Sequence, residues 1–247
     1  MTMKKLIALA FSLFAATANA SGGAGLQHSG ANLNDQESLK NGAALFVNYC
    51  MSCHSLKYMR YSRMAADLGL TEDQVMGALN FTGAKFGEAM TVAMTAADGE
   101  KWLGKAPPDL SLVARVRGGP DWIYTYLKSF YRDPARPLGW NNVLFPGASM
   151  PHVLWEQQGV QSAVFDAPHG GVAGAAPVFA RFESVQPGSL SAEEYDRVAR
   201  DIANFLQYAA EPAALKRQQL GVWVLLFLVV LTAMTWVLKR EYWRDVH

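Results

Sequence analysis

Both cysteines of this 247-residue chain lie in one short stretch, Cys50-Met-Ser-Cys-His54. The spacing C-x-x-C-H is the attachment pattern of c-type haem. Each thiol adds across one vinyl group of the ring, the two intervening residues let one turn present both sulfurs, and the adjacent histidine reaches the iron as proximal ligand. The motif therefore predicts a fold built around one covalently attached haem c, held by Cys50, Cys53 and His54.

Three other uses of a cysteine pair compete with haem attachment. A thioredoxin-like redox pair also has the spacing C-x-x-C, but it follows a strand in a βαβ unit, whereas this motif ends a helical segment. A structural disulfide across two intervening residues has poor geometry. Zinc needs further ligands, and the remaining histidines are scattered along the chain: His28, His152, His169 and His247.

The N-terminus has the three parts of a secretory signal peptide. Lys4 and Lys5 precede an apolar run from Leu6 to Ala16, and Ala18-Asn-Ala20 follows it as a small-residue cleavage site. The alternative, a first transmembrane helix, is disfavoured because the run is too short to cross a hydrocarbon core of roughly 30 Å. Residues 1–20 are therefore predicted to direct export, and in bacteria c-type haem is attached outside the cytoplasm.

The C-terminal part holds an uncharged run from Leu220 to Leu238. About 20 apolar residues are what a membrane-spanning helix requires, whereas a buried soluble helix is seldom so long and apolar on every face. Lys239 and Arg240 follow the run and favour a cytoplasmic tail. Together with the signal peptide, this predicts a periplasmic haem c domain over 21–219, an anchor over 220–238 and a cytoplasmic tail over 239–247, in a single-pass protein of the cell inner membrane.

The charge of the exported part is close to balanced. From Ser21 to Leu220 there are 17 Lys and Arg against 19 Asp and Glu, a net charge of −2. This composition gives no sign of a nucleic-acid partner. A negative charge this small could steer a basic protein partner, but it is equally typical of an ordinary solvated surface.

Two amphipathic helices are predicted near the ends of the exported part. The first starts at Asn34 or Asp35 and runs to about Cys50, and the second starts at a capping box of Ser191 and Glu194 and runs to Glu211-Pro212. A first and a last helix that cross over the haem are the frame of the small cytochrome c fold, although the same pattern also fits two unrelated amphipathic helices. The residues expected at the crossing and on the buried stripes are Leu39, Gly42, Ala43, Phe46, Val47, Tyr195, Val198, Ile202, Phe205, Leu206 and Ala209.

Between these helices the sequence is mostly loop. A capping box from Thr71 to Gln74 predicts a short helix. Gly118-Gly119-Pro120 starts a stronger one, whose apolar face extends to Tyr131 and which Asp133-Pro134 ends. The stretches 81–108 and 134–188 are rich in Gly, Ala and Pro, with a weak strand signal over 178–185. The fold class is therefore mainly α: a cytochrome c-like haem domain with long loops wrapped around the cofactor, plus one C-terminal transmembrane helix.

Segments in a fixed order resemble the cytochrome c1 family, whose members are the haem c subunits of the ubiquinol–cytochrome c oxidoreductase (cytochrome bc1) complex. The extra cysteine pair that some members use for a disulfide is absent, and the stretches 81–102 and 157–181 match only loosely. The matching segments are Tyr49–Ser55, Ala106–Ser111, Arg117–Tyr131, Phe145–Gly147 with Met150-Pro151, and Asp201–Leu206 leading through Glu211-Pro212 to the anchor.

The resemblance implies an electron carrier within an oxidoreductase. The expected partners are cytochrome b, the Rieske iron-sulfur protein as electron donor, and a soluble or membrane-bound cytochrome c as acceptor. No bond is made or broken in this chain itself. Two rivals are a haem enzyme such as a peroxidase, which needs an open iron position, and a free-standing anchored cytochrome, which usually has a long tether where this chain has only Glu211 to Gln219.

Two further site residues are predicted in this setting. Met150 is the expected sixth iron ligand, because it lies in a loop stiffened by Pro146 and Pro151 and because a thioether raises the haem potential. Met90, Met94 and His152 are its competitors, and a plain core methionine is the remaining alternative. Arg117 is expected to pair with a haem propionate, with Arg115 as its local competitor; the resemblance favours Arg117.

Overall fold

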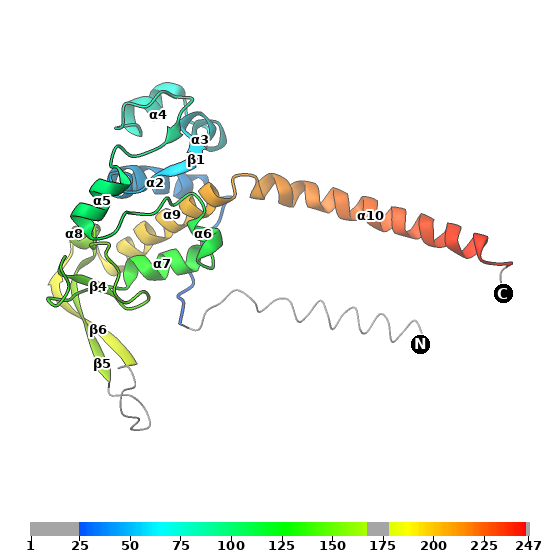
Figure 1. Cartoon of the computed structure of the whole chain (residues 1–247). Helices are drawn as coiled ribbons and strands as arrows, with labels where there is room; N and C mark the ends of the chain where they lie inside the picture. Colours follow the sequence, from blue (N-terminus) through cyan, green and yellow to red (C-terminus); the bar gives the residue numbers. More distant parts are fainter. Residues whose placement is uncertain (1–24, 167–177, 246–247) are drawn as a thin grey trace. The chain divides into compact units, whose positions relative to one another are not determined.

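The computed structural model describes residues 25–166 and 178–245 (Figure 1). The predicted signal peptide, residues 1–20, lies outside the described residues. The chain divides into two compact units, one ending at Ala210 and the other beginning at Glu211. The first unit contains the attachment motif, and the second contains the long apolar helix.

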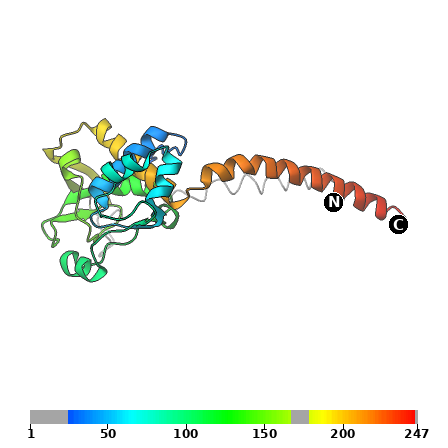
Figure 2. The ribbon, with the colours of Figure 1, turned by 90° about the horizontal axis from the view of Figure 1, so that it is seen from above.

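The frame of the first unit is a close crossing of α2 (Gln36–Leu45) and α9 (Ala192–Ala210), which lie against each other in both ribbon views (Figure 1, Figure 2). Asp35 caps α2 by accepting a hydrogen bond from the backbone N–H of Ser38 at 3.0 Å. The rings of Phe46 and Phe205 meet across the crossing with centroids 5.7 Å apart. The predicted first and last helices and their contact are thus confirmed.

Gly42 allows this close approach. A Cβ placed there would meet the carbonyl oxygen of Asp201 and lie 2.7 Å from the Cβ of Phe205. A buried polar bridge lies beside it: the hydroxyl of Ser38 donates to Asp201 at 2.7 Å and accepts from the side-chain amide of Asn204 at 3.0 Å. Packing and hydrogen bonding therefore both fix the crossing.

Gly42→Ala is expected to destabilise the protein by about 1–3 kcal/mol, because the added methyl group has no space and the two helices must move apart. Gly77 is a matched control: it also lies in a helix, α4 (Glu72–Ala78), but a Cβ there meets nothing within 4 Å. Gly77→Ala should be neutral or stabilising, since alanine has the higher helix propensity. Thermal unfolding followed by circular dichroism compares the two, and equal effects would contradict the close crossing.

Short helices and hairpins complete the unit. The capping boxes at Thr71 with Gln74 and at Ser191 with Glu194 both form and begin α4 and α9 as predicted. The other helices here are η1 (Phe46–Cys50), α3 (Tyr61–Leu68), α5 (Ala96–Leu103), α6 (Val113–Val116), α7 (Pro120–Lys128) and α8 (Trp155–Gln158). The described strands form three two-stranded antiparallel sheets: β1 (Leu56–Arg60) with β2 (Ala89–Met90), β3 (Phe130–Arg132) with β4 (Trp140–Asn142), and β5 (Gly159–Asp166) with β6 (Val178–Pro187).

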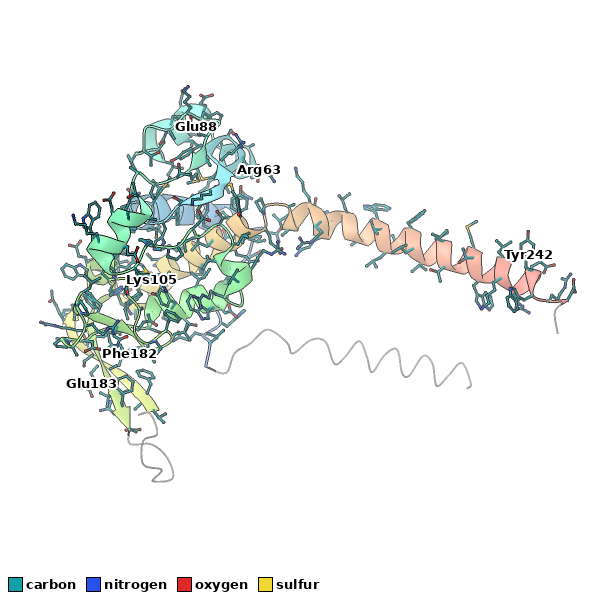
Figure 3. All side chains as sticks on the ribbon, viewed as in Figure 1. Arg63, Glu88, Lys105, Phe182, Glu183 and Tyr242 are labelled. Carbon is teal, nitrogen blue, oxygen red and sulfur yellow. The ribbon has the colours of Figure 1, made fainter. Side chains whose placement is uncertain are left out.

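Two predictions about local structure are wrong. The aromatic helix ends at Lys128, not near Asp133, because Phe130 to Arg132 pair with Trp140 to Asn142 as strand β3. The stretches expected to be loop contain ordered elements: Thr95 caps α5 within 81–108, and β5 pairs antiparallel with β6 within 134–188. The weak strand signal over 178–185 is confirmed by β6, which carries Phe182 and Glu183 (Figure 3).

The second unit is the helix α10 (Ala214–Tyr242). It contains the predicted span 220–238, and no residue of its most apolar window is buried within the protein. At 1.5 Å per residue its length of about 43 Å exceeds the hydrocarbon core. Tyr242 lies at its C-terminal end (Figure 3). Only Glu211 to Ala213 separate it from α9, so the connection between the units is short.

Candidate haem-binding site

The attachment motif follows a π-helical turn, η1. Its closing hydrogen bond runs from the backbone N–H of Met51 to the carbonyl of Phe46 at 2.9 Å, five residues back. Directly after it, the N–H groups of Cys53 and His54 both donate to the carbonyl of Cys50, at 3.1 and 2.8 Å. Such wide turns are uncommon and occur often at functional sites. This wide turn leads directly into the tight turn from Cys50 to His54, which contains both thiols and the imidazole.

The two thiols are not joined to each other. Cys50 is buried and Cys53 half-buried, and neither forms a disulfide. Burial, with a smaller contribution from the neighbouring Cys53, raises the pKa of the Cys50 thiol to about 12. A redox-active pair needs a thiol with a lowered pKa. The environment of Cys50 therefore weighs against the thioredoxin-like alternative.

His54 is oriented by its contact with a backbone carbonyl. Its Nδ1–H donates to the carbonyl oxygen of Pro108 at 2.8 Å, and its side chain is almost fully buried. Burial lowers the pKa of His54, so the imidazole is neutral at neutral pH. A neutral imidazole that donates from one nitrogen to a carbonyl presents the other nitrogen as a metal ligand. The residues of the motif thus fit a covalently attached haem, and the contact with Pro108 leaves Nε2 of His54 available as a ligand.

The segment after Pro107 is tied to the motif by the backbone. The N–H of Leu110 donates to the carbonyl of Ser55 at 2.9 Å, and the carboxylate of Asp109 accepts from the N–H of Lys57 at 2.9 Å. These bonds hold the Pro108 carbonyl against His54. The same segment continues into α6, whose C-cap residue is Arg117.

Met150 lies half-buried in a loop that hydrogen bonds hold in place. Gly147 takes a φ of +80° before it, its N–H donates to the side chain of Asn141 at 2.8 Å, and its carbonyl accepts from the guanidinium of Arg136 at 2.8 Å. The thioether sulfur of Met150 accepts a hydrogen bond from the hydroxyl of Tyr126, with an O–S distance of 3.7 Å. A flexible side chain is therefore fixed at its backbone and at its sulfur.

Arg117 lies beside the Met150 loop. Its guanidinium is 5.2 Å from the centroid of the Trp122 ring and 5.1 Å from that of Phe145, which belongs to that loop. The predicted residues thus form two clusters, one with Cys50, Cys53 and His54 and one with Arg117 and Met150. The segment 107–117 connects them along the chain.

The competing ligands have other surroundings. Met90 is fully buried and pairs in register with Leu56, two residues after His54. Met94 lines a cavity of about 340 Å³ beside Cys53. His152 stacks on Phe130 at 5.0 Å, burial lowers its pKa to about 4, and its Nε2 has no hydrogen-bond partner among the described residues.

Sequence reasoning missed one residue that shapes the site. Asn142 is fully buried; its side-chain oxygen accepts from the N–H groups of Leu144 and Phe145 at 2.9 and 3.1 Å, and its amide donates to the carbonyl of Tyr126 at 2.8 Å. It joins the start of the Met150 loop to α7. The sequence offers no motif at Asn142, because its role depends on contacts across the fold.

The comparisons with known proteins agree with these features. A sequence model described as the Cytochrome C1 family matches residues 27–246. A cytochrome c1 of Allochromatium vinosum is 51% identical over 99% of this chain and 100% of its own length, and one of Rhodospirillum rubrum is 31% identical over 86% and 83%. A protein of Nitrosomonas europaea named ammonia monooxygenase gamma subunit is 44% identical over 86% of this chain and 85% of its own length.

Proposed function

Because the chain belongs to the cytochrome c1 family, we propose that it accepts an electron from a Rieske iron-sulfur protein and passes it to a cytochrome c. Family membership makes it an electron-transfer subunit of the cytochrome bc1 complex with one covalently bound haem c. Haem c, once bound, supplies reversible one-electron chemistry at its iron. The residues of this chain attach it, set its ligands and shield it from water.

The observation that carries the site assignment is the hydrogen bond from His54 Nδ1 to the Pro108 carbonyl at 2.8 Å. It fixes the tautomer and leaves Nε2 as the proximal ligand, while Cys50 and Cys53 provide the two thioether links. A backbone carbonyl partner also increases the basicity of the imidazole.

Met150 is the proposed distal ligand. A second ligand to the iron would come from a part of the chain outside the attachment segment. Met90 pairs in register with Leu56, and Met94 lines the same cavity as Cys53, so both are associated with the attachment segment. The ring of His152 lies flat on Phe130 at an interplanar angle of 6°, which restricts its rotation. Met150 lies in the other cluster, and its soft sulfur favours ferrous iron and a high potential.

Arg117 is proposed to pair with a haem propionate. Among the described residues no carboxylate forms an ion pair with it, and its guanidinium is held over two aromatic rings. A planar guanidinium binds a carboxylate through two parallel hydrogen bonds. Because Arg117 is exposed, solvent screening limits the contribution of this pair to stability.

The proposed membrane arrangement follows from the two targeting signals. Residues 1–20 direct export and are removed, 21–219 form the periplasmic haem domain, 220–238 within α10 cross the inner membrane, and 239–247 form the cytoplasmic tail. Lys239 and Arg240 in the last turn of α10 favour the cytoplasmic side for this end. Cytochrome b and the Rieske protein are the proposed neighbours.

Purification of the full-length chain in mild detergent tests this function. It should co-elute with cytochrome b and a Rieske protein, and quinol should reduce its haem only when the Rieske protein is present. Rieske-independent reduction would contradict the proposed path, and co-elution with monooxygenase subunits would favour the function named for the relative from Nitrosomonas europaea.

In spheroplasts, external protease should digest the haem domain. Protection of this domain from the protease would contradict the periplasmic location.

A further inference from the structure

We propose that Tyr126 is a positioning residue that holds the Met150 thioether in its ligating orientation through an O–H···S hydrogen bond. The inference rests on the proposed function, in which Met150 is the distal iron ligand. It deepens that proposal, because it explains how a long side chain with free rotations is held in one orientation. The O–S distance of 3.7 Å is within hydrogen-bonding range for a sulfur acceptor.

The ring of Tyr126 is itself fixed on two sides. It stacks on Trp122, one turn earlier on α7, with centroids 5.0 Å apart and an interplanar angle of 10°. Phe130 packs edge-on against it with centroids 5.0 Å apart and an angle of 71°. Rings held in these arrangements have little freedom to rotate. The hydroxyl of Tyr126 is therefore a donor at a fixed position.

The backbone on both sides of the hydrogen bond is tied by Asn142. Its side-chain amide donates to the carbonyl of Tyr126, and its side-chain oxygen accepts from Phe145, five residues before Met150. Asn142 is fully buried, so this link is not exchanged for water. The donor on α7 and the acceptor on the loop thus keep their separation.

Hydrogen bonding and ligation can use the same sulfur atom. A thioether sulfur has two lone pairs, so one could bind iron while the other accepts a hydrogen bond from the phenol. The ordinary phenol is protonated at neutral pH and donates. Electron density withdrawn from the sulfur weakens its donation to the electron-poor ferric state more than to the ferrous state. Tyr126 therefore does two things: it orders the ligand and it raises the reduction potential.

The experiment compares three variants of the full-length holoprotein in its complex. Tyr126→Phe keeps the ring and removes only the hydroxyl. Tyr131→Phe is the matched control, because its ring packs on Phe165 and its hydroxyl makes no hydrogen bond to a described residue. Met150→Leu reports on ligation itself. The readouts are the near-infrared sulfur-to-iron charge-transfer band of the oxidised protein, its affinity for cyanide, and its reduction potential.

Tyr126→Phe should keep the charge-transfer band but shift it, and it should lower the reduction potential. It should also bind cyanide about two- to tenfold more tightly, because cyanide must displace Met150 and the hydrogen bond that held Met150 in place has been removed. Tyr131→Phe should match the unaltered protein in all three readouts.

Three results would overturn the inference, and they can be distinguished from one another. If Met150→Leu abolishes the band while Tyr126→Phe leaves the band, the potential and the cyanide affinity unchanged, Met150 is the ligand and Tyr126 does not position it. If the band survives in Met150→Leu, the ligand assignment fails and the inference fails with it. A shift of equal size in Tyr131→Phe would assign the effect to general loosening of the fold and also overturn the role of the Tyr126 hydroxyl.

Discussion

The double substitution Cys50→Ala with Cys53→Ala will abolish covalent haem attachment. Both thioether links depend on these sulfurs, and the chain has no other cysteine to replace them. The protein should show no haem stain after denaturing electrophoresis and should release its haem into acid-acetone. The complex should also lose quinol-dependent reduction of its cytochrome c acceptor, because this chain then holds no covalent redox centre.

Ser52→Ala is the matched control for this result. Ser52 lies inside the motif and is exposed, and the one hydrogen bond of its hydroxyl to a described residue is to the neighbouring Cys53 sulfur at 3.7 Å. It should retain full haem content and a normal spectrum. Haem that stays attached through denaturing electrophoresis in the double-alanine protein would disprove thioether attachment at this motif.

Met150→Leu is expected to leave haem attached but to remove the sixth ligand. Leucine has similar volume and no sulfur, so packing is largely kept while ligation is lost. The near-infrared charge-transfer band of the oxidised protein should disappear. The reduction potential should fall by on the order of 100 mV or more, within the range of roughly 0.8 V over which axial ligands set haem potentials.

Met90→Leu and Met94→Leu are the controls for the ligand assignment. Met90 is fully buried beside Leu56 and Met94 lines the cavity near Cys53, so each tests a methionine in a different environment. Both proteins should keep the band. A band that survives in Met150→Leu and vanishes in one of these two would transfer the role of distal ligand to that methionine.

The helical frame could be predicted from the sequence because its signals are local. Leu39, Ala43 and Phe46 repeat at helical spacing, and all three are buried in the crossing. The capping boxes are read from residues three positions apart, and both form. The end of the aromatic helix could not be predicted this way, because Phe130 to Arg132 are drawn into strand β3 by pairing with Trp140 to Asn142.

The features of the site also divide into those that a local sequence pattern predicts and those that depend on contacts between distant residues. By itself the sequence determines the attachment chemistry and the apolar span, since five consecutive residues contain the whole haem motif and one uninterrupted run contains the anchor. Tertiary structure alone decides the orientation of His54 by Pro108, the contact of Tyr126 with Met150, and the tie made by Asn142. These partners lie 54, 24 and 16 residues apart. Such contacts form only when packing elsewhere has offset the entropic cost of closing the loop between the two residues. No local pattern of residues therefore encodes them.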